Sequence, residues 1–285
     1  MTVTPKFRPA KASSPQKGAS VATSDKRPLL RDIYTIAECM VRKLVQGWLL
    51  FLIAVGVGAL LVVSFQTGPE DIKEVLTKCR ENGILVTTWT SLLLVIIAGS
   101  MELPREVQSE TILFLLAKPI LRRDIVLGKL AGLLVVGFAF VLLQTVVSVT
   151  VIGIRGLGPD WRFTVQTVLI LARVSILASA VILFSTSLPE FQTIFLSAMY
   201  LGLGCIMYLL DALLVSGYLH WSVNWVFRFS YYFAPNFSIL SLSGLSGYRA
   251  PVPFVIHAVG YAASYSMLLT LAALFVFRKR EFGRI

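Results

Sequence analysis

The stretch KLAGLLVVGFAFVLLQTVVSVTVI, residues 129–152, decides the fold class. After Lys129 it carries no charged side chain, and at ~1.5 Å per helical residue it is long enough to cross the ~30 Å hydrocarbon core of a bilayer. Comparable apolar runs recur at approximately 46–65, 84–103, 164–186, 191–217 and 252–277. The sequence therefore predicts an all-α membrane protein with six transmembrane helices.

The composition agrees with a chain that mostly faces lipid. Hydrophobic residues make up 56% of the 285 positions and charged residues 14%, whereas soluble domains carry roughly 25% charged residues. The formal net charge is +11. Its positive residues cluster beside the apolar runs, which is typical of loops held in the cytoplasm near anionic lipid, so we expect no nucleic-acid partner.

The two ends of the chain differ from its middle. Residues 1–27 are rich in Lys, Ser, Pro and Ala, and we expect a disordered cytoplasmic tail there. Residues 28–285 are predicted to form one transmembrane domain. Because the first apolar run begins only near residue 48, we expect no cleavable signal peptide. Three scattered cysteines match no metal spacing, so no metal site and no structural disulfide are predicted.

Residues 29–45 show a helical periodicity before the first apolar run. The apolar residues fall on one helical face, and most charged residues lie off it. The apolar positions are Ile33, Ile36, Ala37, Met40 and Leu44. This pattern favours an amphipathic helix lying in the cytoplasmic interface. The alternative is that the same residues begin the first span as one bent helix.

The distribution of Lys and Arg predicts the orientation. These residues are concentrated before the first predicted span, between the second and third, and after the last. Since cytoplasmic loops are enriched in positive charge, we expect an N-in/C-in topology with the 104–128 loop in the cytoplasm.

The segment 218–251 is aromatic and nearly uncharged. Aromatic side chains at this density suit the headgroup boundary. We interpret the segment as external re-entrant or surface helices before the last span. A covered external loop is the alternative.

The cytoplasmic stretch ELPREVQSETILFLLAKPILRRDIVLGKLAG, residues 102–132, is the most informative for function. Pro104 suits the first turn of a helix, and the residue before Pro119 is disfavoured in the α region. A helix over about 104–118 is therefore predicted between two spans. A compact helix in this position can dock a cytoplasmic motor.

This stretch resembles the pattern of the ABC-2 type permease family, approximately E-x-x-x-(G/R)-T-x-x-x-L-L-x-x-P-x-x-R followed by G-K-x-x-G. The matching residues are Glu106, Thr111, Leu115, Leu116, Pro119, Arg122, Gly128, Lys129 and Gly132. Glu110 departs from the pattern, because the family usually has Gly or Arg there. Within the family the chain looks most like the multicopper-enzyme-maturation permease branch.

The resemblance implies a dimeric membrane unit, a homodimer or a heterodimer, that works with two cytoplasmic ABC ATPase subunits. It implies a coupling helix at about 104–118 and external re-entrant helices that include Ala234-Pro235-Asn236-Phe237. The residues expected to couple to the ATPase are Arg105, Glu106, Glu110, Thr111, Leu115, Pro119, Arg122, Gly128 and Lys129. ATP and Mg²⁺ are expected on the partner subunit, with no cofactor in this chain and no catalytic residue.

Gly128-Lys129 does not match a phosphate-binding loop. That loop requires Gly five residues before the second Gly and Ser or Thr after the Lys. Position 123 is Arg and position 130 is Leu. If ATP drives this protein, another chain is expected to bind it.

Four polar residues inside the predicted spans are candidates for function. Arg173 and Asp211 lie in neighbouring spans at similar depth, and we expect them to pair, either as a static ion pair or on a transport path. Gln144 and His257 are expected to bond neighbouring helices or to contact cargo. Gly56 lies in a small-residue patch that allows close helix packing, at a dimer seam in one interpretation.

The leading hypothesis is the permease subunit of an ATP-driven exporter in the cell inner membrane, working by alternating access on a cargo that the sequence does not identify. Three alternatives stay open at this point. They are a non-transporting scaffold that transmits ATPase motion, an ion-driven secondary transporter, and a membrane-embedded enzyme such as a lipid transferase.

Overall fold

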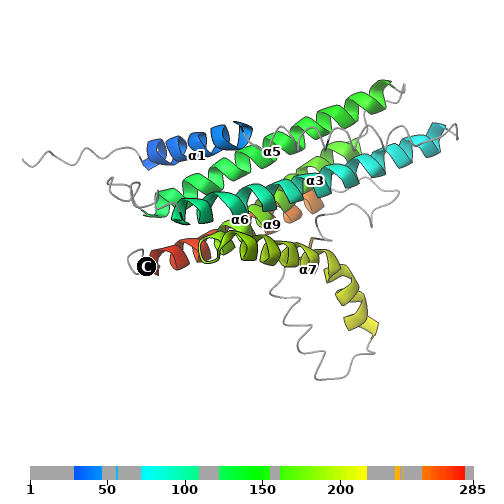
Figure 1. Ribbon diagram of the computed structural model, residues 1–285. Coiled ribbons are helices and arrows are strands. Elements are labelled where there is room, and N and C mark those ends of the chain that lie inside the picture. Colours follow the sequence, from blue (N-terminus) through cyan, green and yellow to red (C-terminus); the bar gives the residue numbers. More distant parts are fainter. Residues whose placement is uncertain are drawn as a thin grey trace, which may run out of the picture.

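The computed structural model describes residues 29–46, 56, 72–108, 122–154, 161–216, 235–237, 240 and 252–279. These residues form six α-helices and no strand (Figure 1). In chain order the helices are α1 Leu29–Gln46, α3 Ile72–Gln108, α5 Arg122–Ile154, α6 Trp161–Ser185, α7 Glu190–Ser216 and α9 Val252–Lys279.

Five of these helices are long and apolar enough to cross a membrane. The qualifying segments are Arg80–Met101, Arg123–Ile154, Phe163–Ser185, Glu190–Met207 and Val252–Lys279. They confirm the last five of the six predicted spans. The first predicted span, 46–65, lies outside the described residues except for Gln46 at its start and Gly56 near its middle. The protein is therefore an all-helical, multi-pass membrane protein.

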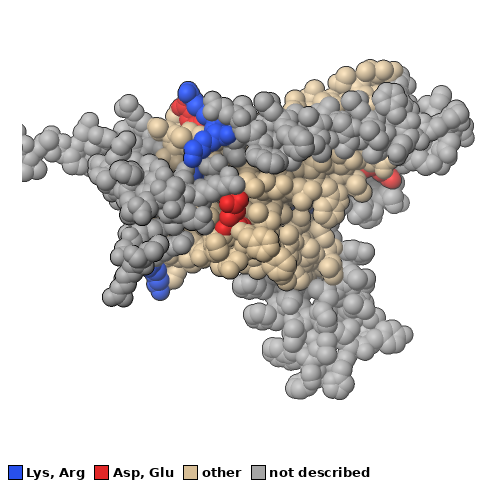
Figure 2. All heavy atoms as spheres, in the orientation of Figure 1, with Lys and Arg blue, Asp and Glu red and all other residues tan. Residues whose placement is uncertain are grey.

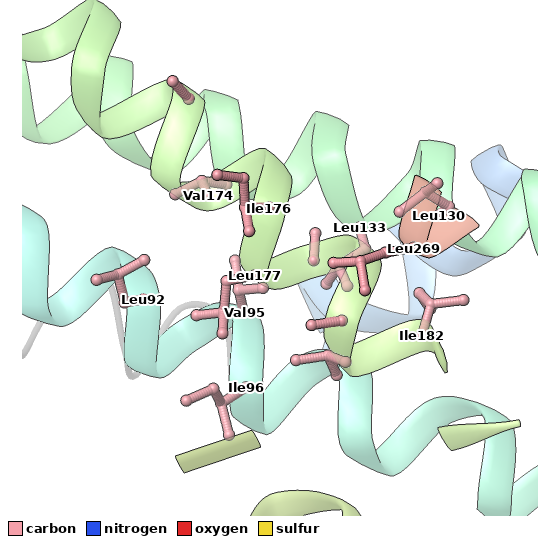
Figure 3. Packing of buried hydrophobic residues seen from close by; sticks show 14 of the residues in the cluster. Leu92, Val95, Ile96, Leu130, Leu133, Val174, Ile176, Leu177, Ile182 and Leu269 are labelled. Atoms are coloured by element: carbon pink, nitrogen blue, oxygen red, sulfur yellow. The ribbon is translucent and has the colours of Figure 1, made fainter. Parts of the chain in front are cut away.

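Helix α6 lies at the centre of the bundle and packs against α3, α5, α7 and α9. Its residues Val174, Leu177 and Val181 are completely buried. Figure 3 shows part of this core, with Val95 of α3 next to Leu177 of α6. Because lipid tails are as apolar as leucine, it is this close packing, rather than removal from water, that stabilises the helix pairs.

Glycines permit the closest approaches in this core. A Cβ built on Gly99 of α3 would lie 2.7 Å from Val181 Cγ1 and 2.8 Å from Leu133 Cδ2. A Cβ built on Gly137 of α5 would lie 3.0 Å from Val174 Cγ1. Either position would have to shift its neighbours to accept a side chain, so these glycines fix the spacing of α3, α5 and α6.

Helix α3 differs from the prediction at both ends. It begins at Ile72, well before the expected start at 84, and it continues through Pro104 to Gln108. The expectation that a separate coupling helix begins at Pro104 is therefore wrong. A proline within a helix removes one backbone hydrogen bond and strains the preceding turn, but Pro104 is buried and only the last turn follows it. Residues 109–121 lie outside the described residues.

The outer surfaces of the bundle are apolar. Phe275, Leu271 and Met267 of α9 and Phe195 of α7 are exposed. In the view of Figure 2, the described Lys and Arg residues lie towards the end of the bundle where α1 is found, and a broad uncharged belt follows. Such a belt is what a lipid-facing surface requires.

Candidate functional site

The first candidate region lies where α1 packs along the beginning of α5. A Cβ built on Gly128 would stand 2.8 Å from both Cβ and Cγ2 of Ile36 and 3.2 Å from the carbonyl oxygen of Ile33. One turn later, a Cβ on Gly132 would stand 3.1 Å from the carbonyl oxygen of Ala37 and from Met40. The two glycines of the G-K-x-x-G pattern thus form the surface on which α1 rests. We call this contact the α1 clasp.

The apolar face predicted for α1 is the face that enters the clasp. Met40 is 2% exposed, and Ile36 and Ala37 touch the glycines of α5. On the opposite face Tyr34 is exposed, and Arg42 forms an exposed ion pair with Glu38 at 2.7 Å. The amphipathic helix is confirmed, and its apolar side packs on protein.

The register of the clasp bears on how α1 lies. Ile36 and Met40 are four residues apart, and so are their partners Gly128 and Gly132. Equal steps in the same direction mean that α1 and α5 run side by side and parallel. This alignment favours the alternative in which α1 is the beginning of the first span. The position in the cytoplasmic interface stays a prediction.

Two charged residues are buried beside the clasp. Lys129 and Asp124 are each 3% exposed. Nε of the exposed Arg123 lies 3.6 Å from Oδ1 of Asp124. Gly128-Lys129 lies inside the continuous helix α5, whereas a phosphate-binding loop precedes a helix. Gly128 therefore packs against α1 and is not part of a phosphate-binding loop.

The other predicted coupling residues are placed only in part. The backbones of Arg105 and Glu106 lie in the last turns of α3, and Arg122 is the first residue of α5. The side chains of these three residues lie outside the described part of the structure, as do Glu110, Thr111, Leu115 and Pro119. Their coupling role stays a prediction.

The second candidate region surrounds Arg173, at the middle of α6. Nη2 of Arg173 donates a hydrogen bond to the carbonyl oxygen of Phe237 at 3.0 Å. The backbone N–H of Phe237 donates to the carbonyl oxygen of Gly204 in α7 at 3.3 Å. Phe237 is therefore held on both sides, by α6 through its oxygen and by α7 through its nitrogen.

The residues before Phe237 complete this attachment. The backbone N–H of Asn236 donates to the Tyr261 hydroxyl of α9 at 3.0 Å. The ring of Phe237 and the carbonyl oxygen of Pro235 lie against Gly204 so closely that the glycine has no room for a Cβ. We call Pro235–Phe237 the anchor segment. It contacts three helices, namely α6 at Arg173, α7 at Gly204 and α9 at Tyr261.

The predicted pair of Arg173 and Asp211 is not settled by these contacts. Asp211 lies in α7 seven residues after Gly204, or roughly 10 Å further along the helix. Its side chain lies outside the described residues, so the pair stays a prediction. Sequence reasoning singled out both Arg173 and the Ala234–Phe237 stretch but did not connect them, because nothing local links residues 64 positions apart.

Gln144 and His257 make different kinds of contact. Gln144 of α5 is completely buried, and its Oε1 lies 2.8 Å from the hydroxyl of Thr90 in α3. Gly56 lies directly against the Gln144 side-chain amide, so the close packing expected at Gly56 occurs within the chain. His257 is exposed, and its Nδ1 lies 2.6 Å from the Pro253 carbonyl oxygen of its own helix.

No group of three His, Cys, Asp or Glu residues gathers within the described ranges in a way that could hold a metal ion. The absence of a metal site stays a prediction for the whole chain.

Comparisons with known proteins bear on identity. Residues 41–209 match a family model described as an ABC-2 family transporter protein. No curated protein matches the chain closely. The matched range runs from the end of α1 through most of α7, and it includes the G-K-x-x-G glycines, the buried Gln144 and Arg173. Since this range is more than half of the chain, the protein belongs to the ABC-2 family of transporter proteins.

Proposed function

We propose that this chain is the permease subunit of an ABC exporter and that a separate cytoplasmic polypeptide supplies the ATPase. Family membership together with five apolar helices supports a membrane permease of an ABC transporter. The direction of transport, the ATPase partner and the cell inner membrane as its location are parts of the proposal. So is membership of the multicopper-enzyme-maturation branch.

The observation that carries the proposal is the continuity of α3. One helix joins Arg105 and Glu106, the predicted docking residues, to Val95 and Leu92 in the core. A helix is stiff along its axis, since successive turns are hydrogen-bonded to each other, and Pro104 removes only one of these bonds. A force applied near Gln108 is therefore delivered to the contacts of α3 with α5 and α6.

The α1 clasp supplies a second mechanical link at the same end of the bundle. Because Gly128 and Gly132 leave no gap between α1 and α5, the two helices are expected to move as one body. Closure of two ATPase subunits would then displace α1, α3 and α5 together. In a dimer of permease subunits, this displacement would open and close a path between the two halves, which is alternating access.

Affinity capture of the full-length chain from its native membrane tests the proposal. An ABC ATPase subunit is expected to co-purify, and Glu106→Lys is expected to abolish its recovery. Glu81→Lys is the matched control, because Glu81 is exposed near the opposite end of α3. ATP hydrolysis by the purified chain alone, or full recovery of the ATPase with Glu106→Lys, would contradict the proposal.

Reconstitution separates transport from its alternatives. A captured complex that hydrolyses ATP without moving any cargo across vesicles would favour the non-transporting scaffold. Cargo movement driven by an ion gradient in the absence of ATP would favour a secondary transporter.

A further inference from the structure

Helix α7 is bent along its length. Figure 1 shows its yellow end turning away from the other helices, although Glu190–Ser216 is one continuous helix. Bends in helices arise mainly at proline, at glycine, at a π-helical turn or where an outside group enters the ladder of backbone hydrogen bonds. Helix α7 contains no proline and no π-helical turn, and its two glycines are Gly202 and Gly204. The glycines and an outside group are therefore the candidate causes of the bend.

An outside donor reaches the backbone ladder at Gly204. The backbone N–H of Phe237 donates to the Gly204 carbonyl oxygen at 3.3 Å. In an α-helix this oxygen accepts from the N–H four residues further on, which is that of Tyr208. A helix carbonyl that also receives a donor from outside tilts away from the helix axis, and the helix opens on that side. The anchor segment thus acts on α7 at one of its two glycines.

The two glycines differ in their surroundings. Gly204 is buried against the Phe237 ring and the Pro235 carbonyl oxygen, so packing explains why it has no side chain. Gly202 has nothing within 4 Å of the place where a Cβ would stand. Apart from proline, glycine is the least favourable residue in a helix interior. Since packing does not require a glycine at position 202, the freedom of its backbone is the property that remains.

The anchor segment is attached to the bundle independently of α7. The Phe237 carbonyl oxygen accepts two hydrogen bonds, from Arg173 Nη2 at 3.0 Å and from the Leu240 N–H at 3.2 Å. The second of these closes a turn, and Leu240 is completely buried. The Asn236 N–H donates to the Tyr261 hydroxyl of α9. These contacts would keep the anchor segment on α6 and α9 if α7 moved.

The part of α7 that precedes the glycines is packed against the bundle. Thr193, Ser197 and Leu201 recur at every fourth residue, and all three are buried. The Tyr200 ring lies edge-on against Phe184 of α6, with the ring centroids 5.8 Å apart. A change in the bend of α7 would therefore move the part after the glycines, while the part before them stays in place.

We propose that α7 is a hinged helix in which residues 205–216 swing about Gly202–Gly204, and that the anchor segment holds the hinge in its bent state. A hinge consists of a few residues that absorb the change in backbone angles between two rigid bodies. Straightening releases the hydrogen bond from Phe237 to Gly204 and the contact of the Phe237 ring. The other bonds of the anchor segment remain. The inference concerns one subunit and depends neither on an ATPase partner nor on a cargo.

The length of the hinged part sets the size of the motion. Ser216 lies twelve residues after Gly204, or roughly 18 Å along the helix. A change in bend of ~20° would therefore move the end of α7 by ~6 Å. A displacement of this size is measurable between two spin labels.

Double electron–electron resonance tests the proposal in the full-length protein in lipid nanodiscs. The background carries Ala in place of the native cysteines at positions 39, 79 and 205. The outer pair of labels is placed at Ser216→Cys in α7 and Ile256→Cys in α9. The inner pair is placed at Phe195→Cys in α7 and Leu271→Cys in α9. Ile256, Phe195 and Leu271 are exposed, so labels there leave the core intact.

Two variants each remove one support of the anchor segment. They are Arg173→Met, on the side of α6, and Tyr261→Phe, on the side of α9. In both variants the outer distance should shift or broaden by ~6 Å, while the inner distance stays that of the wild type. Tyr265→Phe is the matched control, because it removes a hydroxyl one turn further along α9 than Tyr261, the residue that binds the Asn236 N–H. It should leave both distances unchanged.

An outer distance that stays unchanged in both release variants would overturn the proposal. An inner distance that shifts as much as the outer one would do the same, since α7 would then move as a rigid rod. A shift in Tyr265→Phe as large as in Tyr261→Phe would also contradict it. Tyr261→Phe keeps the aromatic ring, so the test remains decisive if Arg173→Met folds poorly.

A further variant tests the position of the hinge. Gly202→Ala reduces the backbone freedom at the centre of the proposed hinge and meets no neighbour within 4 Å. Combined with Tyr261→Phe, it should reduce the shift of the outer distance at least about twofold. A shift that persists in full would show that α7 does not bend at Gly202–Gly204, and the hinge would be refuted.

Discussion

Arg173 of α6 donates a hydrogen bond to the backbone carbonyl oxygen of Phe237, 64 residues further along the chain. A guanidinium at the middle of a membrane helix requires polar partners, and here one of them is the backbone of the anchor segment. The backbone N–H of Phe237 in turn donates to the carbonyl oxygen of Gly204 in α7. Arg173 thereby joins α6 to α7 through a third segment of the chain.

Arg173→Met should destabilise the protein by about 1–3 kcal/mol, because it leaves the Phe237 carbonyl without its charged donor. Thermal unfolding in detergent measures the loss. Arg173→Lys keeps a donor and should lose less. Equal stability of the wild type and Arg173→Met would show that this hydrogen bond contributes nothing.

A double-mutant cycle tests the predicted pair of Arg173 and Asp211. If the two side chains interact, the effects of Arg173→Met and Asp211→Asn on unfolding will differ from additivity by roughly 0.5–3 kcal/mol. Additive effects within ~0.5 kcal/mol would show that the pair is absent. The hydrogen bond between Gly204 and Phe237 does not determine the outcome, because Asp211 lies further along α7 than Gly204.

Gly204→Ala should displace the anchor segment, because the added Cβ would overlap the ring of Phe237. Overpacking of this kind costs typically 1–3 kcal/mol. Gly202→Ala is the control two residues away, where a Cβ would meet nothing within 4 Å. Because alanine has the higher helix propensity, Gly202→Ala should leave the unfolding midpoint unchanged or raise it. A midpoint of Gly204→Ala that does not fall below that of Gly202→Ala would show that the anchor segment accommodates the added Cβ.

The α1 clasp gives a parallel test on α5. Gly128→Ala should loosen α1, since its Cβ would stand 2.8 Å from Ile36 Cβ. Hydrogen exchange of the α1 amides should accelerate in this variant. It should stay unchanged in Gly153→Ala, because Gly153 lies on the same helix with open space around it. Unchanged exchange in Gly128→Ala would show that α5 yields instead.

The helices themselves were predictable from the sequence because hydrocarbon leaves few choices. Every backbone polar group within the bilayer must be satisfied internally, so long uncharged runs such as 129–152 become helices. The apolar face of α1 was also predictable, because the spacing of its apolar residues places them on one side of a helix. Both features depend on residues close together in the sequence.

The features that sequence reasoning missed depend on distant residues. Pro104 suggested a helix start, yet α3 continues past it to Gln108, and Pro104 is buried. The glycines at 128 and 132 were interpreted as part of a docking motif, and only the position of α1 shows what they contact. The Thr90 partner of Gln144 is 54 residues away, and no local pattern marks it.

The hydroxyl pair of Ser179 and Ser266 provides a last prediction, on the attachment of α9 to α6. The two oxygens lie 2.5 Å apart, and Ser266 also lies 3.2 Å from the Ser175 carbonyl oxygen. Hydrogen bonds between membrane helices average only ~0.6 kcal/mol, with a maximum of ~1.7. Ser266→Ala should therefore lower the free energy of unfolding by about this amount. Ser264→Ala is the control, because the exposed Ser264 hydroxyl bonds the Gly260 carbonyl of its own helix. A loss in Ser266→Ala no larger than the loss in the control would mean that α9 is attached by its apolar contacts, such as the buried Ala262 and Ala273, rather than by the serines.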